Sequence, residues 1–439
     1  MNPAPRVVPT DTPVGWRWAP AWVLAYAVLW PASRVSEAVL SLGALLALFL
    51  LAKARFRDHN RLLSARAWAL TTTLFFAYWL PQLISAVDAF DPRAAFTKTL
   101  SGLRYLPFLW LAAIAVATRV GRITVFGGLA VLLLMWSLDL LLQALSGRSL
   151  LFDALDTVYR TLKNGKGICE GQAERGFDRF NGIFGTCNPV LGVLLASFSP
   201  FLLHAAQRRL GTSGWVAAAL LAGIAILLAG SRASWVTYAL VLLFSGWQVL
   251  GWKRLLALFA AGAVALVLLA QAYAPLGDRL ERSAAALQGN GQGMEVALSG
   301  RAKIWGAAAC MIRQHPLNGV GVRDFREAYP ACDPSPAIQP EWGEGPALHA
   351  HQIVLEILAE TGVVGLLLWL AGAALAWRAW RYATAAARER ARPAMLALAV
   401  TVFPLNTHLA FHSSFWGGVL LLLVALYAGS LFSREEPAP

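Results

Sequence analysis

Charged residues are scarce in this chain of 439 residues, at 14% of the total, against about 25% in a typical soluble domain. Hydrophobic residues make up 58%, and the mean hydropathy is +0.56. A charge inside a bilayer is costly, so membrane-spanning chains keep few of them. The shortage of charge excludes an ordinary soluble protein and predicts an all-α polytopic membrane protein.

A compact basic patch is also lacking, although the net charge is +13. The basic residues form short clusters between apolar runs, which is how topology signals are distributed. We therefore expect no nucleic-acid partner. The first 12 residues lack the charged and apolar regions of a signal peptide, so the first apolar run is expected to stay as a membrane anchor.

What the chain has is a series of apolar runs of spanning length. They predict about 12 transmembrane helices, of which the first two are short enough to form a single re-entrant hairpin. The runs cover residues 18–34, 36–53, 67–88, 103–118, 123–145, 188–206, 213–230, 233–250, 254–275, 351–377, 393–411 and 414–431.

Lysine and arginine are distributed unevenly between the loops. With the N-terminus in the cytoplasm, the cytoplasmic loops carry 16 of them and the short outer loops carry 5. This positive-inside asymmetry predicts that both termini are cytoplasmic. The predicted segments are residues 1–146 (helices 1–5), 147–187 (outer loop), 188–275 (helices 6–9), 276–350 (large outer loop with amphipathic helices) and 351–439 (helices 10–12 and a short cytoplasmic tail).

The outer loops hold all four cysteines of the chain, which favours an oxidising compartment and disulfides between neighbours, Cys169 with Cys187 and Cys310 with Cys332. The second loop also contains a helical pattern over 301–314, with apolar residues on one face. We interpret it as an amphipathic helix at the outer membrane interface.

Three arginines stand where spanning helices or this helix begin on the outer side. Arg179 precedes helix 6, where Asn188 and Pro189 have the pattern of a cap and first residue. Arg232 lies in a very short outer turn, which the positive-inside bias disfavours. Arg301 would oppose the dipole of its helix unless an anion binds there. Each could instead be a solvated or interfacial basic residue.

Two histidines lie at the start of predicted helix 10. His349 and His351 are two residues apart and would not share a helix face, which argues against a metal pair. His351 at a helix N-terminus should be kept neutral by the dipole, as a general base requires. The alternative is a hydrogen-bonded structural imidazole. His408 and His412 have no carboxylate nearby in the sequence and are interpreted as structural or secondary.

Helices 6, 8 and 10 all begin on the outer side, each near one of these motifs. Helix N-termini with nearby arginines form a site for phosphate or pyrophosphate. An apolar bundle surrounds this site. The residues therefore indicate an enzyme or carrier that handles a lipid-linked, phosphate-bearing substrate at the outer membrane face.

The ordered set of motifs over roughly 175–370 resembles the O-antigen ligase / O-antigen polymerase superfamily, and most closely the lipid A-core O-antigen ligase. The matching motifs are Arg179…Gly182…Phe184…Asn188-Pro189, Gly230-Ser231-Arg232, Ser299-Gly300-Arg301…Trp305, His315-Pro316…Gly319-Val320-Gly321, and His349-Ala350-His351-Gln352…Glu360…Gly362…Gly365. Two positions depart from the family pattern, because Gln352 and Val190 each stand where the family often has Asn.

The resemblance implies a GT-C-like glycosyltransferase in the bacterial inner membrane, with its active site and outer loops in the periplasm. It would ligate an O-antigen glycan from undecaprenyl pyrophosphate to a sugar hydroxyl of lipid A-core, with inversion and without metal or cofactor. Arg232, Arg301 and Arg179 would hold the pyrophosphate, and His351 would deprotonate the acceptor. His349 and Gln352 would have secondary roles.

Other functions stay open. An O-antigen polymerase or a protein O-oligosaccharyltransferase would share these motifs, although the single long second loop and the short tail are most similar to the ligase. A transporter of lipid-linked glycans would need polar groups near the bilayer midplane. Few polar residues lie in the middle of the apolar runs, and Glu356 and Glu360 are the main exceptions.

The predicted topology can be tested by cysteine labelling from outside the cell. Cysteines introduced near Gly171 and near Gly291 should react with an impermeant reagent. Cysteines near Asn60 and near Ala387 should react only after the membrane is permeabilised. The reverse pattern would invert the orientation and place the candidate site in the cytoplasm.

Overall fold

A computed structural model describes residues 16–53, 62–170, 179–272, 274–288, 291–336, 345–404, 406 and 410–433. The described residues form helices and no strand. In order these are α1 (Ala19–Val28), α2 (Ser33–Lys53), α3 (Ala65–Ser85), α4 (Pro92–Ser101), η2 (Gly102–Arg104), α5 (Tyr105–Ala115), α6 (Arg119–Ser146), α7 (Leu150–Leu162), η3 (Gly182–Phe184), α8 (Leu191–Leu228), α9 (Arg232–Ala272), α10 (Ala274–Ala284), η4 (Ala285–Gln288), α11 (Gly291–Leu298), α12 (Arg301–Gln314), α13 (Phe325–Cys332), α14 (Ile353–Arg381), α15 (Ala385–Thr401) and α16 (Ser414–Leu431).

The prediction of a polytopic, all-helical membrane protein is confirmed for the described residues. Six helices there are long and apolar enough to cross a membrane, namely α2, α6, α8, α9, α14 and α16. Both α8 and α9 consist of two helices joined at a glycine with non-helical backbone, Gly211 and Gly251. Helical residues overlap each of the 12 apolar runs, and the number of membrane crossings stays a prediction.

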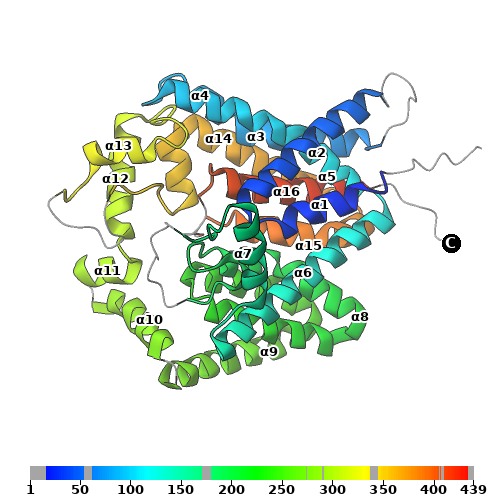
Figure 1. The fold of residues 1–439 in the computed structure, drawn as a ribbon, viewed down its shortest axis with the longest axis vertical. Coiled ribbons are helices and arrows are strands. Elements are labelled where there is room, and N and C mark those ends of the chain that lie inside the picture. Colours follow the sequence, from blue (N-terminus) through cyan, green and yellow to red (C-terminus); the bar gives the residue numbers. More distant parts are fainter. Residues whose placement is uncertain are drawn as a thin grey trace, which may run out of the picture.

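Helix α16 forms the centre of the main core. It is apolar on all sides and buried along almost its whole length, as expected of a helix surrounded by others. Helices α3, α5 and α15 pack around it. Figure 1 shows α16 between α2 and α3 on one side and α6, α8 and α9 on the other.

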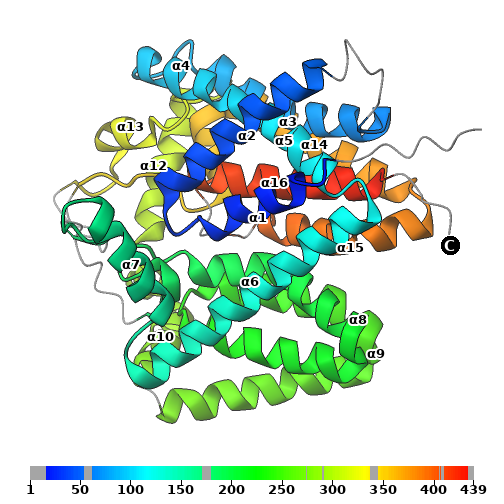
Figure 2. The same ribbon diagram turned by 45° about the vertical axis from the view of Figure 1, so that its right-hand side comes forward.

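The second half of α9 is different, because most of its apolar side chains are exposed. Long apolar helices with exposed side chains are suited to lipid contact. Figure 2 shows α9 at the edge of the molecule, beyond α8. The hydrophobic chain therefore has both a protein-buried centre and an edge that suits the bilayer.

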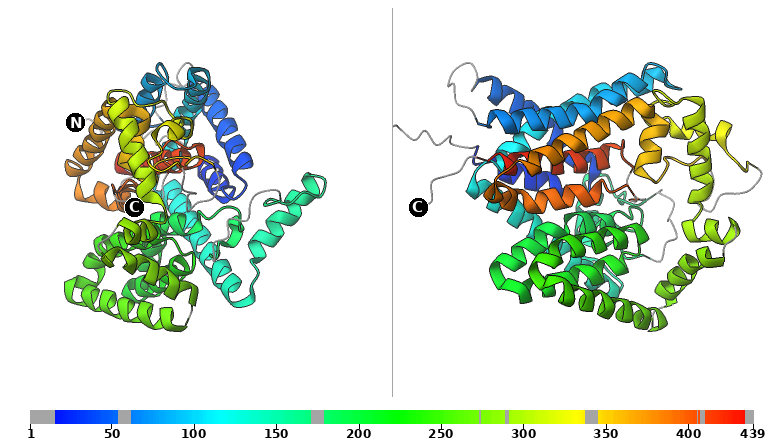
Figure 3. Two further views of the ribbon diagram at one scale, coloured as in Figure 1. Left: turned by 90° about the vertical axis from the view of Figure 1, so that its left-hand side faces the viewer. Right: turned by 180° about the vertical axis from the view of Figure 1, so that it is seen from behind.

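The expected helical loop between α9 and α14 is present and contains α10 to α13. These helices lie along one end of the long helices, and the C-terminal end of α16 lies at the other end (Figure 3). Helix α12 has the predicted bounds, Arg301–Gln314. Its apolar face, however, does not rest on the membrane interface. Ile304, Ala308 and Met311 are buried against α13, residues 347–350 and Ala359 in a second core.

Both expected disulfides are present. Cys169 pairs with Cys187 across the first outer loop, and Cys310 pairs with Cys332, which joins α12 to α13. The described chain has no free cysteine. Each bond closes a short stretch beside the elements that carry the candidate site residues.

Two predicted helix starts are wrong. Helix α8 begins at Leu191, after a turn that contains Asn188 and Pro189, and its N-cap Val190 makes no side-chain cap bond. Helix α15 begins at Ala385, because Thr384 caps it by accepting a hydrogen bond from the backbone N–H of Ala387. Apolar runs show where a chain is hydrophobic, whereas capping decides where the helix begins.

A break at Gly362 divides α14. The segment after α12 supplies hydrogen-bond partners for the backbone groups at the break. The backbone N–H groups of Val363 and Val364 donate to the carbonyls of Pro316 and Leu317, at 2.9 and 3.1 Å. In the other direction, Val320 donates to the carbonyl of Ala359 at 2.9 Å, and Gly321 donates to that of Glu360 at 3.2 Å. The loop thus replaces the helical bonds that the break removes.

Replacing Gly362 by Ala should destabilise the protein more than replacing Gly211 by Ala. Both glycines have positive φ, of 64° and 68°, with ψ of −165° and −152°, so each substitution carries a backbone cost of about 1–3 kcal/mol. A Cβ at Gly211 meets nothing within 4 Å, whereas one at Gly362 would lie 2.2 Å from the Leu317 carbonyl oxygen. Thermal unfolding of both variants in detergent measures the difference. Equal losses would contradict the importance of the loop contact.

Candidate functional site

Five arginines gather where α8, α9, α10 and α12 meet the first outer loop. Arg232 is the first residue of α9, Arg301 is the first residue of α12, and Arg279 and Arg282 belong to α10. Arg179 precedes η3. The structure thus brings together all three arginines expected from the sequence and adds two.

The electrostatics of Arg179 show how close these charges are. Burial, followed by the positive charges of Arg279, Arg301, Arg232 and Arg282, lowers the pKa of Arg179 to about 10. Burial and Arg232 together lower the pKa of Arg301 to about 10. Both side chains still carry a proton at neutral pH. The cluster therefore holds mutually repelling charges, which a bound polyanion would stabilise.

Arg232 is held by neutral acceptors. Its guanidinium donates to Ser299 Oγ at 2.6 Å, to Ser283 Oγ at 3.1 Å and to the carbonyl of Ala297 near the end of α11. In the part of the chain that the structure describes, no ion pair neutralises Arg232 or Arg301. Gly300 is the N-cap residue of α12, and no side chain caps this helix start.

Arg279 lies directly against the turn between α8 and α9. It is only 8% exposed. Gly230 has φ +68°, and a Cβ there would lie 2.3 Å from a guanidinium nitrogen of Arg279. A glycine at this position therefore both permits the turn and leaves room for the arginine.

The segment before η3 is fixed to α6, which positions Arg179. The N–H of Gly182 donates to Gln143 Oε1 at 2.8 Å, and Phe184 packs edge-on against Trp136 at a centroid distance of 5.5 Å. The N–H of Phe180 points to the carbonyl of Leu228 at 3.5 Å. The first outer loop thus returns to the turn that carries Arg232.

The histidine segment differs from the expectation for a regular helix start. His351 lies two residues before α14 and has left-handed backbone, with φ 51°. The rings of His349 and His351 are 3.9 Å apart, so the prediction that they point apart is wrong. The reason is that two-residue spacing separates side chains only in regular helix, and this segment is a turn.

Two contacts hold this turn. Trp305 Nε1 donates to the carbonyl of Ala350 at 3.1 Å. Gln352 caps α14, because its Oε1 accepts from the N–H of Leu355 at 2.6 Å, while its Nε2 donates to the Pro404 carbonyl at 2.8 Å. Trp305 is one helical turn beyond Arg301 on α12, so the arginine cluster and the histidines are tied to the same helix.

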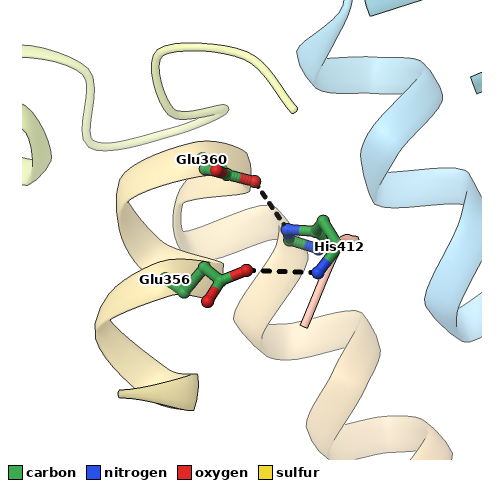
Figure 4. A group of neighbouring side chains, drawn as sticks. All are labelled: Glu356, Glu360 and His412. Atoms are coloured by element: carbon green, nitrogen blue, oxygen red, sulfur yellow. Dashed lines mark hydrogen bonds and ion pairs between the residues drawn. The ribbon is translucent and has the colours of Figure 1, made fainter. Parts of the chain in front are cut away.

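A second cluster, not expected from the sequence, joins the first half of α14 to the residue His412 (Figure 4). His412 Nδ1 is 2.8 Å from Glu360 Oε2, and the His412 N–H donates to Glu356 Oε1 at 3.1 Å. All three residues are buried. The interpretation of His412 as having no carboxylate nearby is therefore wrong, because the fold brings together residues 52 positions apart. His408 lies outside the described residues.

Glu356, Glu360 and His412 could also hold a metal ion, since one ligand atom from each lies within 4.8 Å of the others. The sequence did not indicate such a cluster, because its members are far apart along the chain. The close contact between His412 and Glu360 shows that hydrogen bonding can also satisfy the pair. The metal-free reaction itself stays a prediction.

Residues 217–370 match the family model described as O-antigen ligase. This part of the chain belongs to the O-antigen ligase and polymerase superfamily. No curated protein matches the chain. The matched region contains Arg232, Arg301 and His351, whereas Arg179 lies before it.

The match over residues 217–370, together with the long apolar helices, supports a multi-pass membrane enzyme of a general glycosyltransferase kind that uses lipid-linked glycans. Sequence reasoning missed two arginines of the O-antigen ligase domain, Arg279 and Arg282. The signal was present, because they are three residues apart on a short helix and therefore share a face. Only the fold shows that this face meets Arg232.

Replacing Gly230 by Ala should weaken the binding of inorganic pyrophosphate by displacing Arg279. We expect a loss of about tenfold, the usual effect of one charge-assisted contact. Calorimetric titration of the purified protein measures it. Gly211→Ala is the matched control, because that glycine has the same φ of 68° but open space around it. Unchanged pyrophosphate binding in Gly230→Ala would show that Arg279 does not contribute to the anion site.

Proposed function

We propose that this protein ligates an undecaprenyl-pyrophosphate-linked O-antigen glycan to a sugar hydroxyl of lipid A-core, at the periplasmic face of the bacterial inner membrane. The observation that carries the proposal is the convergence of five arginines around the start of α12, the helix whose Trp305 also bonds to the histidine turn. The superfamily match supports it independently.

In this proposal the arginines bind the donor's pyrophosphate. Pyrophosphate is already a good leaving group, and its charge grows as the glycosidic bond breaks. Preorganised cations such as Arg232 and Arg301 stabilise that charge without reorganising. A general acid is then unnecessary, because the departing group leaves as an anion.

His351 acts as the general base in this proposal. Its imidazole takes the proton of the acceptor hydroxyl, the freed oxygen attacks the anomeric carbon, and the bond to pyrophosphate breaks on the opposite side. A single displacement of this kind inverts the anomeric configuration. The bond from Trp305 to Ala350 supports the role, because it fixes the histidine turn to the helix that begins with Arg301.

The acceptor distinguishes ligation from the related reactions. A polymerase would extend a second undecaprenyl-linked unit, and a protein oligosaccharyltransferase would modify a serine or threonine. The single long second outer loop favours the ligase, because it is most similar to the loop of that enzyme. Purified protein should be given labelled donor with each acceptor separately. A joined product with lipid A-core alone would support ligation, and a product with another acceptor alone would overturn it.

Replacing His351 by Ala should abolish transfer while pyrophosphate binding is retained. A general base typically contributes about 10²–10⁴-fold to the rate. Arg232→Ala and Arg301→Ala should weaken pyrophosphate binding as well as rate, since charge-assisted contacts act on both bound donor and transition state. Single-turnover transfer and calorimetric binding separate the two effects.

His349→Ala is the comparison variant, because its ring lies 3.9 Å from that of His351. Loss of transfer in His349→Ala alone would assign the base to His349. Normal transfer in both variants would leave only positioning and charge stabilisation at the site.

Chelation should leave transfer intact, because arginines take the place of a metal at the pyrophosphate. The rate is measured with and without a divalent-ion chelator. A loss that a divalent cation restores would direct attention to Glu356, Glu360 and His412. Glu356→Gln would then test whether that cluster is the metal site.

A further inference from the structure

A second basic site lies away from the arginine cluster, at the outer ends of α3, α4, α5 and α16. It is a cavity of about 60 Å³, large enough for a group of phosphate size. Its cationic lining residues are Lys98, Arg104 and Arg323, the His412 ring also lines it, and no carboxylate is among the lining residues. We call it the basic pocket.

Two of its cations have no counter-charge in contact. Arg104 forms an ion pair with Glu37. Lys98 and Arg323 form no ion pair within the part of the chain that the structure describes. Lys98 acts electrostatically on Asp324, and Arg323 acts on Glu356, without an ion pair in either case. Both long side chains are partly buried at the wall of one small cavity.

The backbone around the pocket is arranged to present these groups. Arg323 has left-handed backbone, with φ 65°, which is unusual for a residue with a Cβ and is typical of functional sites. Ser413 and Ser414, at the N-terminus of α16, also line the cavity, and free N–H groups at a helix start favour anions. Glu360 holds the His412 ring at the wall through the 2.8 Å contact.

The pocket is separate from the proposed donor site. Its lining comes from α3, α4, η2, α5, α16 and residues 322–323, and none comes from α8 to α12. Figures 1 and 3 show α3 and α4 at one side of the molecule and α8 to α10 at the other, with α14 and α16 between them. An anion bound in the pocket would therefore belong to a different substrate from the one held by Arg232 and Arg301.

We propose that the basic pocket binds a phosphate group on the headgroup of the acceptor lipid. The inference rests on the proposed function, because it assigns the pocket to the second substrate of that reaction. An acceptor bound there and a donor bound by the arginines would approach the histidine turn from opposite sides of α14. That separation suits the attack of the acceptor oxygen opposite the leaving pyrophosphate.

An apolar groove beside the pocket favours a lipid over a soluble anion. The groove has a volume of about 330 Å³ and is lined by α3, α14, α15 and α16. Tyr78 lines both cavities, and Phe411, which lines the groove, precedes His412, which lines the pocket. A single lipid can therefore place its phosphate in the basic pocket and an acyl chain in the groove.

The test measures binding of lipid A-core to purified protein without any donor, so that it does not depend on transfer. Lys98→Gln and Arg323→Gln should each weaken binding by about tenfold, as expected for one charge-assisted contact. Acceptor treated with phosphatase should bind the wild type more weakly and should no longer distinguish the variants. Arg93→Gln is the matched control, because it removes one exposed charge from α4 outside the cavity. Thermal unfolding confirms that each variant is folded.

Three results would overturn the proposal. Unchanged lipid A-core binding in both variants would show that the pocket does not take the acceptor. An equal loss of binding to phosphatidylglycerol vesicles would assign the pocket to bulk membrane lipid. Weakened binding of the undecaprenyl-linked donor, with acceptor binding intact, would assign it to the donor. If transfer is absent while acceptor binding follows the expected pattern, the proposed reaction fails and the pocket assignment stands.

Discussion

The arrangement of this protein depends on an exchange of backbone hydrogen bonds at the break in α14. A break in a membrane helix leaves N–H and C=O groups that lipid cannot satisfy. Here residues 316–321 supply the missing partners, through Val363 to Pro316 and Val320 to Ala359 among others. Gly319 and Gly362 permit the approach, since a Cβ on either would lie within 2.3 Å of the opposite backbone.

That exchange connects the outer helices to the membrane core. It sets Glu360 at the end of the first half of α14, where its carboxylate meets His412. It also fixes Gly321, which begins the turn that contains Arg323, and Arg323 lines the basic pocket. One local backbone constraint thus positions groups of the basic pocket and of the second hydrophobic core.

The arginine cluster is the opposite case, because it is electrostatically unfavourable by itself. Several positive charges share a partly buried space, and the low pKa of Arg179 reflects burial and mutual repulsion. Hydrogen bonds to Ser283, Ser299 and the carbonyl of Ala297 hold Arg232 in this space. A site that keeps such charges together is stabilised when a polyanion enters, which is the chemistry that a pyrophosphate donor supplies.

The sequence by itself determined the features that depend on local pattern. Apolar runs located the helices, the outer cysteines indicated the pairs Cys169–Cys187 and Cys310–Cys332, and the motif around Arg301 predicted α12 to the residue. The ordered motifs also identified the superfamily. Only the tertiary structure decided that Arg279 joins the cluster, that His412 meets Glu360, and that the apolar face of α12 is covered by protein. Hydropathy and capping act over a few residues and can be seen in the sequence, whereas these contacts join residues tens of positions apart and exist only once the helices have packed.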